Sequence, residues 1–121
     1  MGSDAMRIVI RHISGSRAGE VDVIPLGAHR ELILGRAGSS AVRFDPRRDA
    51  TVGRQHARIE PIESREAPGR LQIVDLGSRN GTLVNGRRIG TPAPLVAGDV
   101  VQLGDDGPRL EIHIELPMAP R

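Results

Sequence analysis

The chain of 121 residues contains no cysteine, lysine, tryptophan or tyrosine, and Phe44 is its only aromatic residue. Without cysteine it can form neither a disulfide nor a thiolate metal site, and it fits a reducing compartment such as the cytoplasm. Without lysine it can form neither a P-loop nor a Schiff base, which excludes two large classes of enzyme. The scarcity of aromatic residues argues against single-stranded nucleic acid as a ligand, because its binding relies on stacking of bases on aromatic rings.

The seventeen basic residues are all arginine and are nearly balanced by fifteen acidic residues, which leaves a net charge of +2. The isoelectric point of about 10.8 would nevertheless be typical of a strongly basic protein. It is high because no side chain titrates between histidine and arginine, so the small positive charge persists to high pH. The isoelectric point therefore reflects the missing lysines, and we expect no nucleic acid as a partner.

No apolar run approaches the roughly 18 residues that a membrane helix needs, and no leader of secretory type is found. We therefore expect no membrane association. We interpret residues 1–5 as a remnant of an expression vector, with the native sequence starting at Met6. Residues 6–116 are expected to form one domain, and residues 117–121 a flexible tail that begins a linker in a longer chain.

Alternation of apolar and polar residues with a period of two predicts short β-strands. In residues 110–116, four aliphatic residues alternate with Glu111, His113 and Glu115, which places the two sets on opposite faces of a strand. Fifteen glycines and nine prolines interrupt the chain, and no stretch has the apolar spacing of a long helix. The pattern predicts an all-β fold, either a sandwich or a barrel. The other expected strands lie at residues 7–12, 21–25, 31–34, 70–75, 83–84 and 99–103, with a hairpin turn at 104–107 and irregular connections at 61–69 and 92–98.

The most informative segment is Asp75-Leu-Gly-Ser-Arg-Asn-Gly-Thr-Leu-Val-Asn-Gly86, a polar loop between two apolar runs. Gly77, Asn80 and Gly81 tolerate the left-handed backbone angles of tight turns, and Asn85-Gly86 is a second turn dipeptide. The loop also gathers hydroxyl, amide and guanidinium groups, which suit recognition of a polar ligand. Turn chemistry alone would explain most of these residues, so the segment by itself leaves a purely structural double turn as an alternative.

Two further motifs precede this segment, namely Leu32-Ile-Leu-Gly-Arg36 and Asp49-Ala-Thr-Val-Gly-Arg-Gln-His-Ala-Arg-Ile59. In this order and at these separations, the three motifs resemble the forkhead-associated (FHA) family of phosphothreonine-binding domains over about residues 30–116. The resemblance implies a two-sheet antiparallel β-sandwich of the FHA/SMAD-like type, with recognition loops at one end. It also implies a partner protein or peptide that carries phosphothreonine, a place in Ser/Thr kinase signalling, and no cofactor.

The resemblance assigns six residues to phosphopeptide binding and four to support of the site. Family members usually have serine where this chain has Gly53, and that serine hydroxyl binds the phosphate. Glycine offers only its backbone N–H, and losing one hydrogen bond to a charged group costs about 1.5–3 kcal/mol. The guanidinium of Arg54 or Arg79 is a candidate replacement, and Ser39 and Ser40 are further candidate donors. The implied binding residues are Arg36, Gly53, Arg54, Ser78, Arg79 and Asn80, and the supporting residues are Gly35, His56, Gly81 and Thr82.

Two functions of different kinds follow from these residues. The first is a phosphothreonine-dependent binding module, and the second is a phospho-independent interaction or assembly domain in which Gly53 marks the loss of the original site. An enzyme is not expected, because the sequence has no nucleophile elbow and Asp105 and Asp106 lie in a predicted turn. A metal site is not expected either, because the four histidines do not have the spacing of metal ligands.

Overall fold

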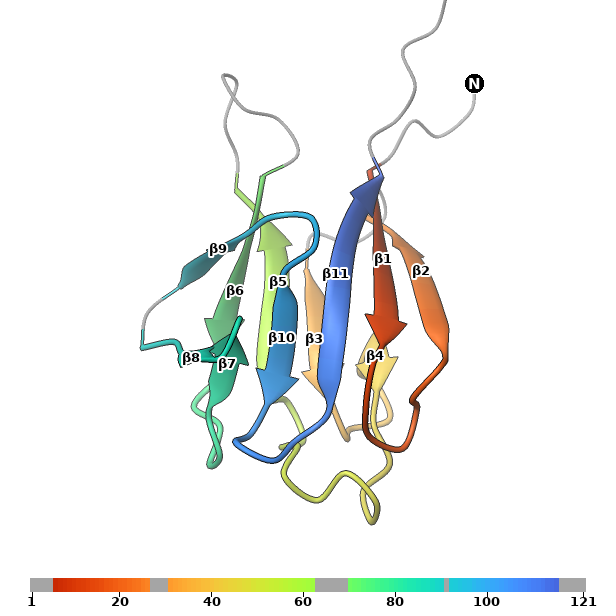
Figure 1. The fold of residues 1–121 in the computed structure, drawn as a ribbon, viewed down its shortest axis with the longest axis vertical. Coiled ribbons are helices and arrows are strands. Elements are labelled where there is room, and N and C mark those ends of the chain that lie inside the picture. The colour runs from red at the N-terminus through yellow and green to blue at the C-terminus, as the bar shows by residue number, and fades with distance from the viewer. Residues whose placement is uncertain (1–5, 27–30, 63–69, 91, 116–121) are drawn as a thin grey trace, which may run out of the picture.

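The computed structural model describes residues 6–26, 31–62, 70–90 and 92–115 (Figure 1). These residues contain strands and loops but no helix, so no membrane-spanning helix occurs among them. The expected remnant at 1–5, the expected tail at 117–121 and most of the expected loop at 61–69 lie outside the described residues. The strands are β1 (Arg7–His12), β2 (Val21–Pro25), β3 (Leu32–Gly35), β4 (Val42–Arg43), β5 (Ala57–Pro61), β6 (Leu71–Asp75), β7 (Thr82–Val84), β8 (Arg87–Arg88), β9 (Ala93–Leu95), β10 (Val100–Leu103) and β11 (Arg109–Glu115).

These strands form two sheets that pack against each other (Figure 1). One sheet has six strands in the order β2-β1-β11-β10-β7-β8, and the other has five in the order β4-β3-β5-β6-β9. Neighbouring strands run antiparallel, except that β3 and β4 are parallel. The predicted all-β, two-sheet antiparallel sandwich is therefore confirmed, with one parallel pair as the exception.

The core lies between the sheets, because strands from both sheets carry aliphatic side chains on their inner faces. In β1, Ile8, Ile10 and His12 point inward, as the alternation predicts, and none is more than 2% exposed. Burial of one aliphatic side chain contributes about 1.5–3 kcal/mol to the stability of the fold. Because many are buried here, the packed sheets form a rigid frame for the loops at the strand ends. The buried apolar residues are Ile8, Ile10, Leu26, Leu32, Leu34, Val42, Phe44, Val52, Ala57, Ile59, Leu71, Ile73, Leu95, Val101, Leu103, Leu110 and Ile112.

Some elements differ from the sequence prediction. The connection at 92–98 is not irregular throughout, because Ala93–Leu95 form β9 and pair with β6 at the edge of the sheet. An edge position tolerates Pro94, which has no backbone N–H to donate. The strand expected at 31–34 lies at Leu32–Gly35, and the two-residue strands β4 and β8 are too short to show an alternating pattern.

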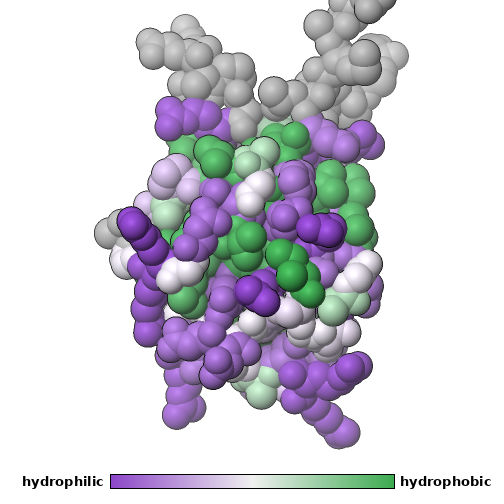
Figure 2. All heavy atoms as spheres, in the orientation of Figure 1, coloured by the Kyte–Doolittle hydropathy of each residue, from purple (hydrophilic) through white to green (hydrophobic). Residues whose placement is uncertain are grey.

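The three motifs lie at one end of the sandwich, the lower end in Figure 1. Strand β6 belongs to the five-stranded sheet and β7 to the six-stranded sheet, so residues 76–81 cross from one sheet to the other. The crossing segment is therefore not a hairpin loop within a single sheet. In the same view, hydrophilic side chains cover most of this end (Figure 2). The fold thus gathers polar loops from both sheets at one end.

Candidate functional site

Three loops are joined by hydrogen bonds at this end of the sandwich. They are residues 36–41 after β3, residues 44–56 between β4 and β5, and residues 76–81 between β6 and β7. The first and second loops meet where the Arg36 N–H donates to the Gly53 carbonyl at 2.9 Å. The second and third meet where the Asn80 side-chain amide donates to the Thr51 carbonyl at 3.0 Å. The structure therefore brings the three sequence motifs together.

The first and second loops approach so closely that the residue before Arg36 must be glycine. A Cβ atom added to Gly35 would lie 2.0 Å from the carbonyl oxygen of Arg54. That same carbonyl accepts the N–H of Ala37 at 3.1 Å, so it cannot move away without breaking a hydrogen bond between the loops. Gly35 thus allows the contact that positions Arg36 beside Gly53.

The ring of His56 connects the second and third loops. Its Nδ1 accepts the N–H of Gly53 at 2.9 Å, and its Nε2 lies 2.8 Å from the carbonyl oxygen of Gly81. Burial lowers the pKa of His56, and the hydrogen bond to Gly81 does not offset this effect. A neutral ring with its proton on Nε2 satisfies both contacts, because it accepts at one nitrogen and donates at the other.

The carboxylate of Asp75 organises the third loop from the end of β6. Its Oδ2 accepts the N–H groups of Gly77 and Ser78 at 3.1 and 2.9 Å. Its Oδ1 accepts the hydroxyls of Ser78 and Thr82 at 2.5 and 2.6 Å. Burial alone would raise the pKa of Asp75, but the hydrogen bonds from Ser78 and Thr82 outweigh it and lower the pKa. The charged form of Asp75 is therefore the form that this loop stabilises.

This lowered pKa predicts that Asp75 contributes stability that is lost in acid. A carboxyl group whose pKa is lowered by folding stabilises the native state fully above its unfolded pKa of about 3.9, and progressively less as the pH falls below it. We expect Asp75→Asn to lower the unfolding free energy at pH 7 by about 1–3 kcal/mol, because the amide keeps only one acceptor oxygen, so that either the two hydroxyls or the two backbone N–H groups lose their acceptor. Urea denaturation from pH 7 to pH 3 should show this difference shrinking below about pH 4. The exposed turn residue Asp105, changed to Asn, is the control and should shift stability little at either pH.

The predicted binding residues occupy different positions within the joined loops. Arg36 is partly buried, and its Nε donates to the carbonyl of Val52, which fixes the plane of the guanidinium group. Arg54 and Arg79 are exposed. The hydroxyl of Ser78 donates to Asp75 and accepts the N–H of Gly81 at 3.0 Å, so it takes part in contacts inside the loop. Of the two further candidate donors, Ser39 is exposed, and the Ser40 hydroxyl lies 3.5 Å from the Arg54 carbonyl.

Gly53 has room for a side chain but no donor to offer. Glycine has only its backbone N–H as a donor, and this group already donates a hydrogen bond to Nδ1 of His56. A Cβ atom added there would lie 3.7 Å or more from every neighbour, which is ordinary van der Waals distance. Its φ angle is not among the positive values found at other glycines, so the backbone does not require glycine either. Neither the backbone conformation nor the space around a Cβ atom therefore requires glycine at this position.

The structure also brings two side chains to the site that sequence reasoning missed. Arg88 on β8 covers the backbone of Gly81, since a Cβ atom there would lie 2.5 Å from the Arg88 Nε. Thr51 donates its hydroxyl to the Leu103 carbonyl at 2.9 Å. The hairpin signal Asn85-Gly86 would have placed Arg88 opposite Leu83, next to this loop. A hollow of about 390 Å³ is lined by Thr51, Arg79, Asn80, Arg88, Asp105 and Asp106.

The sequence is similar to a known domain family and to two curated bacterial proteins. The profile of the FHA domain family matches residues 32–104. The glycogen accumulation regulator GarA of Mycolicibacterium smegmatis is 43% identical over 70 residues, which are 58% of this chain and 39% of GarA. The oxoglutarate dehydrogenase inhibitor of Corynebacterium diphtheriae is 40% identical over 81 residues, which are 62% of this chain and 50% of that protein. This chain therefore spans half or less of the length of these two curated relatives.

A solved structure shows the same architecture over nearly the whole chain. It comes from a study titled as an analysis of phosphothreonine-dependent FHA domain interactions, and it is 25% identical to this chain. The two superimpose with a TM-score of 0.67, covering 95% of this chain and 99% of the other. The match of the family profile and the shared sandwich architecture point to the same family. This chain belongs to the FHA domain family.

Proposed function

We propose that this domain binds a protein or peptide carrying phosphothreonine, and that it acts by binding alone in cytoplasmic Ser/Thr kinase signalling. The FHA family is known for phosphothreonine binding, and the solved relative was studied for interactions of that kind. The two bacterial relatives are named as a regulator of glycogen accumulation and an inhibitor of oxoglutarate dehydrogenase. A regulatory role through protein binding is therefore the proposed role for this domain as well.

The observation that supports this proposal best is the position of Arg36 where the first two loops meet. Its Nε is held by the Val52 carbonyl, while the terminal nitrogens of the same guanidinium fork have no protein partner within the described ranges. Nor does any carboxylate in those ranges form an ion pair with Arg36. An oriented guanidinium group without a counter-ion is suited to two parallel hydrogen bonds with a phosphate.

The second and third loops offer the other groups that a phosphopeptide needs. A phosphothreonine carries nearly two negative charges and three strong acceptor oxygens, so it favours several cations and donors on a rigid frame. Arg54 and Arg79 project from the second and third loops, and both are exposed. Asn80 is anchored to Thr51 by its side-chain amide, which leaves its amide oxygen for the main chain of a bound peptide.

A binding screen tests this function directly. Isothermal titration calorimetry or fluorescence anisotropy would compare phosphothreonine, phosphoserine and unphosphorylated versions of the same peptides, drawn from a degenerate library. We expect micromolar binding of some phosphothreonine peptides and none of their unphosphorylated or phosphoserine counterparts. Absence of binding across a broad phosphothreonine library would contradict the proposal.

The second candidate function is phospho-independent protein binding on the same scaffold. Gly53 supports it, because this residue lacks the usual hydroxyl and its N–H is already bonded to His56. In that case, complexes recovered with the domain would survive phosphatase treatment, and Arg36→Ala would leave them unchanged. Complexes that dissociate on phosphatase treatment would exclude this alternative.

A further inference from the structure

Strand β2 forms an edge of the six-stranded sheet. It pairs with β1, and no other described strand lies on its opposite side. In an antiparallel pair, every second residue turns both backbone polar groups toward the neighbouring strand, and the residues between turn them away. Leu26 donates its N–H to the Met6 carbonyl at 2.8 Å, and the Glu20 carbonyl accepts the His12 N–H at 2.9 Å, so even-numbered residues face β1. The residues of β2 that turn their backbone groups to the free edge are Val21, Val23 and Pro25.

The solvent-facing side of this edge is apolar. Val21 and Val23 are 53% and 51% exposed, and Ile13, just beyond the β1 residue that pairs with Val21, is 38% exposed. In the described part of the chain, the one other large hydrophobic residue with such exposure is Val96, between β9 and β10. Figure 2 shows hydrophobic side chains at the surface on the side of the molecule where β2 lies. Apolar residues gathered at a free strand edge mark a site where another strand can pair.

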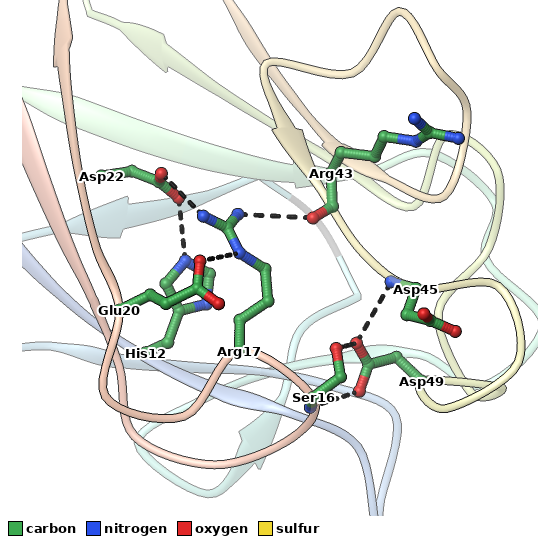
Figure 3. A network of polar contacts seen from close by, with 8 residues as sticks. All are labelled: His12, Ser16, Arg17, Glu20, Asp22, Arg43, Asp45 and Asp49. Carbon is green, nitrogen blue, oxygen red and sulfur yellow. Dashed lines mark hydrogen bonds and ion pairs between the residues drawn. The ribbon is translucent and has the colours of Figure 1, made fainter.

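A polar network at the β1–β2 turn holds this edge in place (Figure 3). Arg17 donates to the carboxylates of Glu20 and Asp22 at 2.9 and 2.8 Å, and to the carbonyl of Arg43 on β4 at 3.3 Å. The second oxygen of Asp22 lies 2.8 Å from Nε2 of the buried His12. These contacts join β2 to β1 and to the other sheet, so little further ordering is needed before its free edge can pair.

We propose that two copies of this chain pair through β2, antiparallel and about a two-fold axis at Val23, and so form a weak dimer with one continuous sheet. We call the paired segments, residues 21–25 of both copies, the β2 seam. In this register the N–H and carbonyl of Val23 bond to those of Val23 in the second copy, and each Val21 N–H donates to a Pro25 carbonyl. Because Pro25 has no N–H, the Val21 carbonyl gains no donor from it.

The side chains favour a second copy in this register. On the outer face, Val23 meets Val23 and Val21 meets Pro25, so the exposed valines of both copies cover one another. On the inner face, Asp22 lies opposite Ile24 of the second copy. A shift of the pairing by two residues would instead place Asp22 opposite Asp22, and like charges directly opposite each other destabilise a strand pair.

The charges beside the seam are balanced within each copy. Arg7 and Arg11 of β1 lie on the outer face next to the apolar residues of β2. Their guanidinium groups form ion pairs with Glu115 at 2.6 Å and Glu111 at 3.1 Å on β11. Each copy therefore presents paired charges around an apolar centre, and two copies can approach without opposing fields of one sign.

The two-fold axis directs the two candidate phosphate sites away from each other. Strand β2 begins at the end of the sandwich that carries the motif loops and runs toward the opposite end (Figure 1). Antiparallel pairing of β2 therefore places the motif loops of the two copies at opposite ends of the dimer, where the seam covers neither. The dimer would present two binding sites at once, although the pairing itself does not depend on the proposed function.

Sedimentation velocity over a range of protein concentrations tests the dimer. One pair of edge strands forms an interface below the standard size, so we expect a dissociation constant of about 10–300 µM. The weight-average mass should rise from 13.0 kDa at low concentration toward twice that value at about 1 mM.

Two valine substitutions distinguish the β2 seam from any other contact. Val23→Lys should weaken the dimer at least about tenfold, because it places two ammonium groups opposite each other at the axis. Val96→Lys is the matched control, since Val96 is an equally exposed valine away from β2, and it should dimerise like the wild type. Urea denaturation would verify that both variants are folded, and Val21→Lys offers a second substitution in the seam.

Disulfide trapping tests the register. The wild type has no cysteine, so Val23→Cys carries a single thiol. In the proposed register, the two Cα atoms at position 23 lie about 5.5 Å apart, within the range of a disulfide. Under mild oxidation, we expect Val23→Cys to form a linked dimer at least about tenfold faster than the control Val96→Cys, which has no such partner in the seam.

Three results would each overturn the dimer. They are a mass that stays at 13.0 kDa up to about 1 mM, a dimer that persists unchanged in folded Val23→Lys, and equal rates of linkage in the two cysteine variants. A phosphothreonine peptide should bind Val23→Lys as it binds the wild type, because the seam lies outside the three motif loops. Failure of every such peptide to bind either protein would refute the proposed function and leave the dimer standing.

Discussion

Replacing Arg36 with alanine is expected to weaken phosphothreonine-peptide binding about a hundredfold or more. The guanidinium fork can make two charge-assisted hydrogen bonds, and hydrogen bonds to charged groups contribute about 1.5–3 kcal/mol each. Alanine would also remove the bond from Nε to the Val52 carbonyl, which helps to join the first two loops. Isothermal titration calorimetry with the best phosphothreonine peptide from the screen would measure the change.

Two comparisons separate a direct role of Arg36 from a structural one. Arg36→Lys retains a positive charge but not the planar fork, so it should restore only part of the lost affinity. Urea denaturation should show that both variants are folded at the assay temperature. The control variant Arg7→Ala removes an exposed arginine elsewhere, and it should also stay folded. Unchanged peptide affinity in a folded Arg36→Ala variant would remove Arg36 from the site and favour the phospho-independent alternative.

Restoring serine at position 53 is expected to strengthen phosphopeptide binding about ten- to a hundredfold. The added hydroxyl would supply the phosphate with a hydrogen bond worth about 1.5–3 kcal/mol. The structure allows the change, because a Cβ atom at Gly53 meets nothing closer than 3.7 Å. Replacing a flexible glycine should also leave stability unchanged or raise it by up to about 1 kcal/mol. Titration of the same peptide with the wild type and Gly53→Ser would measure the gain.

An unchanged affinity in Gly53→Ser would leave two explanations, which a second substitution distinguishes. If Arg54 or Arg79 already replaces the missing hydroxyl, Arg79→Ala or Arg54→Ala should weaken wild-type binding, and Gly53→Ser should rescue the loss. If the site no longer binds phosphate, none of these substitutions will alter affinity. The exposed Arg87, which lies outside the three loops, provides the matched control as Arg87→Ala.

Much of the fold could be predicted from the sequence because local patterns carry most of the information. The alternation in β1 and β11 predicted the inner faces of these strands: in β11, Leu110 and Ile112 are buried and Ile114 is partly buried, while Leu116 lies outside the described residues. The turn at Asn85-Gly86 has both residues at positive φ, 51° and 84°. Strand β5 was not predicted, and the strands β4, β8 and β9, with two or three residues each, are too short to show an alternating pattern. Strand β4 has only two residues, and β9 includes Pro94, which is unusual within a strand.

The candidate site was less predictable, because its contacts join residues that are distant in the sequence. The motif order identified the family and predicted that the loops carrying Arg36, His56 and Asn80 lie at one end, where hydrogen bonds join them. It did not show that the Gly53 N–H is bonded to His56, because this contact depends on where the neutral imidazole lies. It also missed Arg88, which reaches Gly81 only because β7 and β8 form a hairpin beside the crossing loop.

By itself, the sequence determined the family, the strand pattern and the residue types available to a ligand, because backbone preferences and the spacing of motifs are local properties. The tertiary structure decided how those groups are used. It committed the Ser78 hydroxyl and the Gly53 N–H to contacts within the protein. It also left Arg36, Arg43 and Arg48 without counter-ions in the described part of the chain. The reason is physical: whether a polar group is free to bind depends on its neighbours in space, and the packing of the two sheets sets those neighbours.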